Sequence, residues 1–197
     1  MTRLNAEAEQ ALVAQCRQRN FESFGLIVDA YQNRILGYVK RMVKDPEDAL
    51  DITQEVFVKA FQAFDRFDGR SSLRTWLFRI AHNLCIDRAR KIERSPNTLN
   101  LEPADPDAEE WQVADERWNP ESLVMDGELM DLVEQSLSTM SERLRTVLIL
   151  HDAEDMAYEE IAETLNVPVG TVKSRLFLAR AHLKASVLAY RQEVNEI

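Results

Sequence analysis

Hydrophobic residues recur at helical spacing along most of the chain, and the clearest pattern lies in residues 158–184. Its first part predicts a short helix, because the apolar residues fall three and four positions apart. Asn166 and Pro168 then end the pattern. Asparagine tolerates the left-handed conformation found at helix ends, and proline disfavours the helical region for the residue before it. A second helix is predicted next, with one apolar stripe at Val172, Leu176, Ala179 and Leu183.

The polar face of this second helix is basic. From Val169 to Arg191 the chain has five Lys or Arg residues and no acidic residue. Two helices, a tight turn and a positive second helix are typical of a helix-turn-helix whose second helix enters a major groove. An ordinary helical hairpin with a solvated basic face is the alternative on this pattern alone. The polar face consists of Lys173, Ser174, Arg175, Phe177, Arg180 and Lys184.

The first half of the chain predicts a helical bundle. Residues 6–44 indicate two or three helices with apolar stripes. Asp45 and Pro46 then predict a helix start, since an acceptor side chain at the cap and proline at the first position favour one. That helix should run to about Phe64. Its polar side indicates either a solvated face, with acids near the helix N-terminus, or a docking surface for a basic partner. The residues on that side are Asp48, Asp51, Gln54 and Glu55.

A turn and a further helix follow. Asp68, Gly69 and Arg70 predict the turn, and Ser71 or Ser72 can cap a helix over residues 73–91. The polar face of this helix carries basic side chains that can attract phosphates and an amide that can donate a hydrogen bond to a base edge. Aromatic side chains flank this face. Single-stranded nucleic acid is recognised by such a surface. The exposed positions are Arg74, Arg79, Asn83, Asp87, Arg90 and Lys91.

Composition and charge are compatible with a nucleic-acid binder once the charge is divided along the chain. The 197 residues are 45% hydrophobic and carry a net charge of −10. By region the charge is +3 for residues 1–95, −7 for 96–125 and −6 for 126–197. Residues 66–94 alone carry +5. The positive charge is therefore concentrated in residues 66–94 and 169–191. DNA binding requires local positive charge, so a negative net charge does not argue against it. The chain contains no run of eighteen apolar residues and its start lacks an apolar signal core, so we expect a cytoplasmic protein.

Residues 95–125 differ from the rest. They are rich in acids and proline and poor in aliphatic residues, so they cannot bury enough apolar surface to fold alone. Trp111 and Trp118 are unusual in such a segment, and their role is open. We therefore predict an all-α protein with helical domains at 1–94 and 126–197 joined by an acidic flexible linker at 95–125.

Few residues indicate metal or redox chemistry. Cys16 and Cys85 are far apart in sequence and do not form a metal-binding pair, so we expect two buried free thiols. His82 stands alone, so it is a poor metal-ligand candidate, and we expect a surface or half-buried histidine. We predict no cofactor and no bound metal.

Two separate stretches resemble bacterial RNA polymerase sigma factors of the extracytoplasmic-function group, in particular the envelope-stress sigma-E branch. Residues 48–91, DALDITQEVFVKAFQAFDRFDGRSSLRTWLFRIAHNLCIDRARK, are similar to sigma region 2. Residues 140–183, MSERLRTVLILHDAEDMAYEEIAETLNVPVGTVKSRLFLARAHL, are similar to sigma region 4. The resemblance implies promoter recognition and strand opening, without catalytic chemistry. It also implies three partners: core RNA polymerase through its clamp helices and flap, promoter DNA, and an anti-sigma factor, which can be membrane-bound.

The resemblance also implies which residues act, and here they are assigned by position. Leu178 stands where the similar envelope-stress sigma factor of enteric bacteria has arginine, which leaves the preferred −35 sequence open. The surface that binds core polymerase would be Asp48, Asp51, Gln54 and Glu55. The −10 element would meet Phe67, Asp68, Gly69, Arg70, Ser71, Ser72, Arg79, Asn83, Arg90 and Lys91. The −35 element would meet Thr171, Lys173, Ser174, Arg175, Phe177 and Arg180.

Two other classes of protein compete with this interpretation. An ordinary helix-turn-helix regulator accounts for residues 126–191 but gives the 48–91 motif no purpose. A metal-dependent enzyme could use His151, Asp152 and the Glu159–Glu160 pair. The sequence has no H-x-x-x-H spacing to support it, and those acids suit a helix start.

Overall fold

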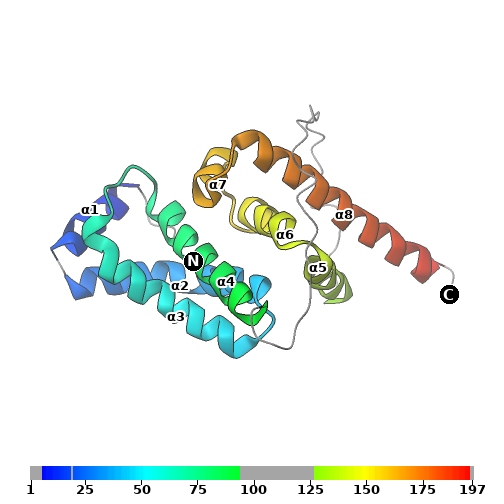
Figure 1. Ribbon diagram of the computed structural model, residues 1–197, viewed down its shortest axis with the longest axis horizontal. Helices are drawn as coiled ribbons and strands as arrows, with labels where there is room; N and C mark the ends of the chain where they lie inside the picture. Colours follow the sequence, from blue (N-terminus) through cyan, green and yellow to red (C-terminus); the bar gives the residue numbers. More distant parts are fainter. Residues whose placement is uncertain (1–5, 19, 94–126, 196–197) are drawn as a thin grey trace. The chain divides into compact units, whose positions relative to one another are not determined.

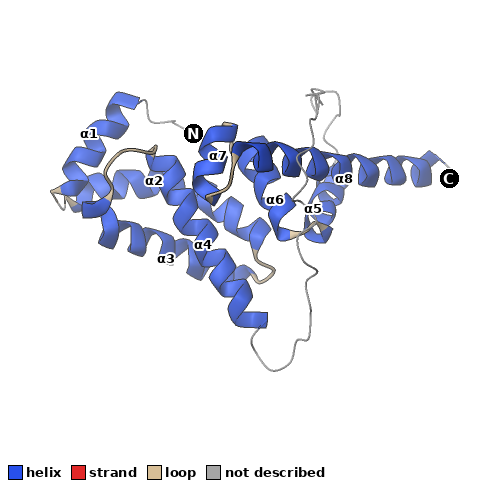
Figure 2. Ribbon diagram, turned by 45° about the horizontal axis from the view of Figure 1, so that its top comes forward, coloured by secondary structure: helices blue, strands red, loops and turns tan. Residues whose placement is uncertain are grey.

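The computed structural model describes residues 6–18, 20–93 and 127–195, and every regular element among them is helical (Figures 1 and 2). The chain forms two compact units, one containing α1 to α4 and the other containing α5, α6, η3, α8 and most of α7. The predicted helical pattern is therefore confirmed. The linker predicted at 95–125, with Trp111 and Trp118, lies outside the described residues. Within the described ranges, no helix is long and apolar enough to cross a membrane.

The first unit is a bundle in which α2, α3 and α4 pack against one another. The caps of α2 and α3 follow from local sequence. Asn20 accepts hydrogen bonds from the backbone N–H groups of Glu22 and Ser23, and Asp45 accepts one from Glu47, with proline at the first position of α3. The elements are α1 Ala6–Arg17, α2 Phe21–Met42, α3 Pro46–Ala63, the 3-10 turn η1 Phe64–Arg66 and α4 Leu73–Glu93.

An aromatic cluster closes one end of this bundle, where α3 passes through η1 into the turn before α4. Phe64 is 2% exposed. Its ring lies 5.9 Å from Phe24 and 5.5 Å from Trp76, both edge-on, and 5.9 Å from Phe67. Such aromatic pairs each contribute roughly 0.5–1.5 kcal/mol beyond their buried area. The turn that follows is therefore anchored to a well-packed aromatic cluster.

The second unit contains the predicted helix-turn-helix. Asn166, between α7 and α8, has φ 55° and ψ 49°, which is the left-handed conformation expected at this helix end. The four residues of the predicted stripe on α8 are all buried. Ser141 occupies the cap position of α6, but its side chain makes no capping hydrogen bond. The elements are α5 Gly127–Thr139, α6 Glu142–Leu148, the π-helical turn η3 Ile149–Ala153, α7 Tyr158–Leu165 and α8 Val169–Asn195.

The thiols and the isolated histidine lie where the sequence placed them. Cys16 and Cys85 are both buried and free, and burial raises the pKa of the Cys16 thiol. His82 is half-buried on α4, and its Nδ1 lies 3.1 Å from the Tyr38 hydroxyl oxygen. Burial lowers the pKa of His82 to about 4.

This histidine predicts a dependence of stability on pH. The pKa of an unfolded histidine is about 6.5, so between about pH 6.5 and pH 4 the unfolded chain binds a proton that the folded chain excludes. The free energy of unfolding should therefore fall by about 1–2 kcal/mol as the pH drops from 7 to 5. Urea denaturation at both pH values measures this loss. His82→Gln should reduce the loss, and equal losses in the variant and the wild type would contradict the assignment.

Candidate nucleic-acid and protein interfaces

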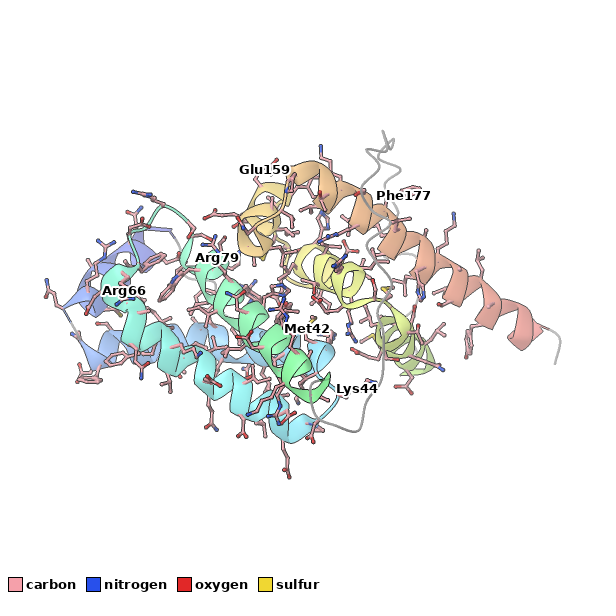
Figure 3. All side chains as sticks on the ribbon, in the orientation of Figure 1. Met42, Lys44, Arg66, Arg79, Glu159 and Phe177 are labelled. Carbon is pink, nitrogen blue, oxygen red and sulfur yellow. The ribbon has the colours of Figure 1, made fainter. Side chains whose placement is uncertain are left out.

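The N-terminal half of α8 presents a polar and aromatic surface opposite its buried stripe. Lys173 and Phe177 lie four residues apart on this surface, and both are exposed, Phe177 to 51%. Figure 3 labels Phe177 on α8. Thr171 and Ser174 are half-buried beside them. Leu178 is 41% exposed, so an apolar side chain stands on the same outer surface. This half of the helix can offer one cation, an aromatic ring and two hydroxyls to a DNA groove.

Two arginines predicted to contact DNA have a different environment. Arg175 is half-buried. Arg180 donates a hydrogen bond from Nη2 to Asp152 Oδ1 at 2.7 Å, and its Nη2 lies 3.3 Å from His151 Nδ1. Arg180 therefore ties α8 to the η3 turn, and its side chain is only 22% exposed.

The side chain of Lys173, near the start of α8, packs over a pair of stacked rings, Tyr158 and His151. The Lys173 ammonium lies 5.6 Å from the centre of the Tyr158 ring, and that ring stacks on His151 at 5.1 Å. A cation over an aromatic face is stabilised by the ring quadrupole. Lys173 is therefore both exposed and held near one position, which favours a defined contact.

The turn before α4 is shaped by its own polar side chains. Gly69 has φ 75°, which residues other than glycine rarely adopt. Asp68 Oδ1 accepts a hydrogen bond from the Arg70 N–H at 3.1 Å, and its carboxylate pairs with the Arg70 guanidinium at 3.0 Å. Ser72 Oγ accepts a hydrogen bond from the Thr75 N–H, so Ser72 rather than Ser71 provides the predicted cap. The Arg70 side chain is 89% exposed at the outer edge of the turn.

Phe67 is placed differently from the rest of this predicted site. It is 5% exposed, and its ring lies 4.9 Å from that of Trp76. Phe67 therefore belongs to the aromatic cluster that carries the turn, and in this structure it offers no face to a base. Sequence reasoning missed this because one aromatic residue next to a glycine turn suits either role.

The exposed face of α4 continues from this turn. Asn83, Arg90 and Lys91 are exposed. Arg79, labelled on α4 in Figure 3, lies one helical turn before Asn83. At 100° per residue, Arg79, Asn83 and Arg90 share one side of the helix. An exposed amide and an exposed guanidinium, those of Asn83 and Arg90, therefore lie on one side of α4.

The outer face of α3 is acidic with two apolar residues. Asp51, Gln54 and Glu55 are exposed, and Glu55 pairs with Lys59 at 3.3 Å. Leu50 is 50% exposed and Val58 is 53% exposed. The signal in the sequence for these two residues is their spacing, since each lies four positions from Gln54 and so shares its side of the helix. The α3 docking face, defined as Leu50, Asp51, Gln54, Glu55 and Val58, thus offers both charge and apolar area to a partner.

Asp48 does not belong to the α3 docking face, because its carboxylate forms an ion pair with Arg88 inside the first unit. Both of its carboxylate oxygens accept hydrogen bonds from Arg88 on α4, and its side chain is 14% exposed. This bidentate contact raises the pKa of Arg88. Asp48 therefore joins α3 to α4 and presents little of its charge to solvent.

Two of the residues that suggested a metal-dependent enzyme, Asp152 and Glu160, have partners inside the chain. Asp152 is engaged by Arg180, and Glu160 Oε2 accepts a hydrogen bond from the Ala157 N–H at the start of α7. Across the residues that the structure describes, no group of three His, Cys, Asp or Glu side chains could hold a metal ion. Asp152 and Glu160 thus each have a partner within the second unit.

Comparisons with known families identify the class of protein. The model of Sigma-70 region 2 matches residues 27–95, and the model of Sigma-70 region 4 matches residues 130–183. The chain belongs to the sigma-70 family of RNA polymerase sigma factors, and its relatives include members of the extracytoplasmic-function group. The family indicated by the two sequence motifs is confirmed.

Individual relatives align over nearly the whole chain. The RNA polymerase sigma-H factor of Pseudomonas aeruginosa is 36% identical over 178 residues, which cover 90% of this chain and 92% of that protein. The ECF RNA polymerase sigma-E factor of Escherichia coli K12 is 35% identical over 173 residues, which cover 87% of this chain and 90% of that protein.

Solved structures have the same fold. CnrH, solved in complex with the cytosolic domain of CnrY, matches with a TM-score of 0.67 and 25% identity, over 92% of this chain and 98% of CnrH. The sigma factor RpoE of Bartonella quintana, solved with the anti-sigma factor NepR, matches with a TM-score of 0.66 and 24% identity. That match covers 84% of this chain and 97% of RpoE.

Proposed function

We propose that this chain binds core RNA polymerase through the α3 docking face and directs it to promoters through the two basic helical surfaces. The observation that carries the proposal is the arrangement within the first unit, where α3 exposes acids and α4 exposes an amide with cations. The charges of the two helices suit different partners, a basic protein surface and a nucleic-acid backbone. A plain DNA-binding regulator would have no use for the docking face.

The −10 surface that we propose consists of the 68–72 turn and the α4 side chains Arg79, Asn83, Arg90 and Lys91. Strand opening exposes unpaired bases, and a protein captures such a base with edge-reading donors while cations hold its phosphates. The exposed Asn83 amide supplies the donor. Phe67 supports the turn from the core in this proposal.

The −35 surface that we propose is the first half of α8. Lys173 and Phe177 form its centre, with Thr171 and Ser174 beside them. Arg175 and Arg180 lie at its margins, where a half-buried guanidinium suits a phosphate contact better than a deep base contact. Leu178 adds an apolar contact where the enteric relative has arginine, which predicts a different −35 preference.

Regulation and location follow from the class of protein. We propose that an anti-sigma factor holds this chain in check as part of a stress response, and that it covers the α3 docking face. The proposal is supported by the fold similarity to a sigma factor solved with its anti-sigma factor. We further propose that the chain acts in the cytoplasm, that polymerase supplies all catalytic chemistry, and that the functional divisions are 1–94, 95–125 and 126–197.

Transcription with purified core polymerase tests the function directly. Templates randomised at the −10 and −35 positions should yield transcripts from defined start sites when the chain is added, and the selected templates should share two short elements. Core polymerase alone is the control. Binding to duplex DNA without retention of core polymerase and without defined transcripts would instead indicate a helix-turn-helix regulator.

A further inference from the structure

Helix α1 reaches both ends of the turn that we assign to the −10 element. At the far end, Glu9 Oε1 accepts a hydrogen bond from the Leu73 N–H at 3.2 Å. The other oxygen of the same carboxylate accepts a hydrogen bond from the Tyr31 hydroxyl at 3.1 Å. One side chain of α1 therefore joins α2 to the first residue of α4.

At the near end, Arg17 makes the corresponding contact. Its Nη2 donates a hydrogen bond to the Phe67 carbonyl oxygen at 2.5 Å. A Cβ atom placed on Gly69 would lie 3.9 Å from the same nitrogen, so the guanidinium also lies close to the left-handed glycine of the turn. Arg17 and Glu9 are eight residues apart on α1, and they hold the two backbone groups between which residues 68–72 run.

These contacts concern the backbone, so they can fix the shape of the turn. The Leu73 N–H is one of the first four donors of α4, which have no partner inside the helix. Leu73 and Phe67 are 1% and 5% exposed, so water cannot easily replace a lost partner at either end. Between the two ends, the Asp68 carboxylate pairs with the N–H and the guanidinium of Arg70 inside the turn.

We propose that α1 is a brace that preorganises the −10 turn, with Glu9 and Arg17 as positioning residues that do not themselves read DNA. The proposal rests on the proposed function in that this turn is the one that meets the opened strand. A preformed turn lowers the ordering cost when a base is captured. Loss of the brace should therefore weaken capture of single-stranded DNA and leave the other two surfaces unaffected.

Limited proteolysis tests the brace without DNA or polymerase. Arg70 is a trypsin site in the turn, and Lys59, inside α3, reports unfolding of the unit as a whole. In Glu9→Ala and Arg17→Ala, cleavage after Arg70 should become about five-fold faster relative to cleavage after Lys59, as expected for loss of one hydrogen bond. Gln10→Ala, at an exposed neighbouring position on α1, is the matched control and should match the wild type.

Conservative variants distinguish a role of Glu9 and Arg17 in hydrogen bonding from an effect of their charge alone. Glu9→Gln keeps an acceptor for Leu73 and should lie between the wild type and Glu9→Ala. Arg17→Lys keeps the charge but loses the guanidinium fork, so it should also show partly faster cleavage. An unchanged Arg70-to-Lys59 cleavage ratio in both alanine variants would overturn the brace, as would equal acceleration at the two sites.

A binding assay with the complete holoenzyme tests the consequence for function. The Glu9→Ala and Arg17→Ala holoenzymes should bind a single-stranded −10 oligonucleotide about five-fold more weakly. Their affinities for core polymerase and for a −35 duplex should stay within two-fold of wild type. The turn variant Arg70→Ala tests the −10 assignment separately from the brace. If it also binds normally, the −10 assignment of the turn is wrong, while the cleavage ratio still decides on the brace.

Discussion

Reversing two charges on α3, with Asp51→Lys and Glu55→Lys together, should weaken binding to core polymerase by about 100-fold. Both side chains are exposed on the α3 docking face, and like charges brought together at an interface cost several kcal/mol. Helix content should be unchanged, because Ile52 and Val56 of the buried stripe are untouched. Co-elution with core polymerase and fluorescence titration measure the loss.

Two controls make this result specific. Glu22→Lys with Asp29→Lys changes the net charge equally at exposed positions of α2 and should leave core binding within about three-fold of wild type. Asp51→Asn with Glu55→Gln removes the charge without adding repulsion and should give an intermediate loss. Wild-type affinity in the charge-reversed variant would show that α3 does not dock on polymerase.

The apolar part of the docking face explains why a partner could bind tightly there. Exposed acids alone contribute little at physiological salt, since exposed ion pairs are worth about 0–1 kcal/mol. Leu50 and Val58, each about half exposed, add area that a partner would remove from water. The acids would then select a basic partner and set its orientation, while the apolar residues supply much of the affinity.

The recognition helix should be most sensitive at Lys173. We expect Lys173→Glu to weaken binding of the holoenzyme to a −35 duplex by about 30-fold at moderate salt, and to reduce the salt slope by about one unit. The reason is that the ammonium is exposed at the start of α8 and held over the Tyr158 ring. Fluorescence anisotropy across a salt series measures both quantities.

Lys184 provides a matched control on the same helix. It is also exposed, but it lies about 16 Å farther along α8, beyond the N-terminal turns that enter a groove. Lys184→Glu makes the same charge change and should cost less than about three-fold. Equal losses in the two variants would mean that α8 attracts DNA only through its overall charge, without a defined docking geometry.

The sequence by itself determined the secondary structure and the class of protein. Helix starts at Asp45 and Ser72 and the helix end at Asn166 depend on side-chain acceptors and backbone preferences within a few residues. The buried stripe of α8 is equally local, because the helical period fixes which residues share a face. The motifs at 48–91 and 140–183 also indicate the sigma factor family from the sequence alone, and the family comparisons confirm it.

Only the tertiary structure decided which polar and aromatic residues remain available for partners. Asp48 pairs with a residue 40 positions away, Arg180 with one 28 away, and Glu9 bonds a backbone group 64 away. No local period encodes such partners, since they depend on how separate helices pack. The same packing buries Phe67 and leaves Leu50 and Val58 exposed.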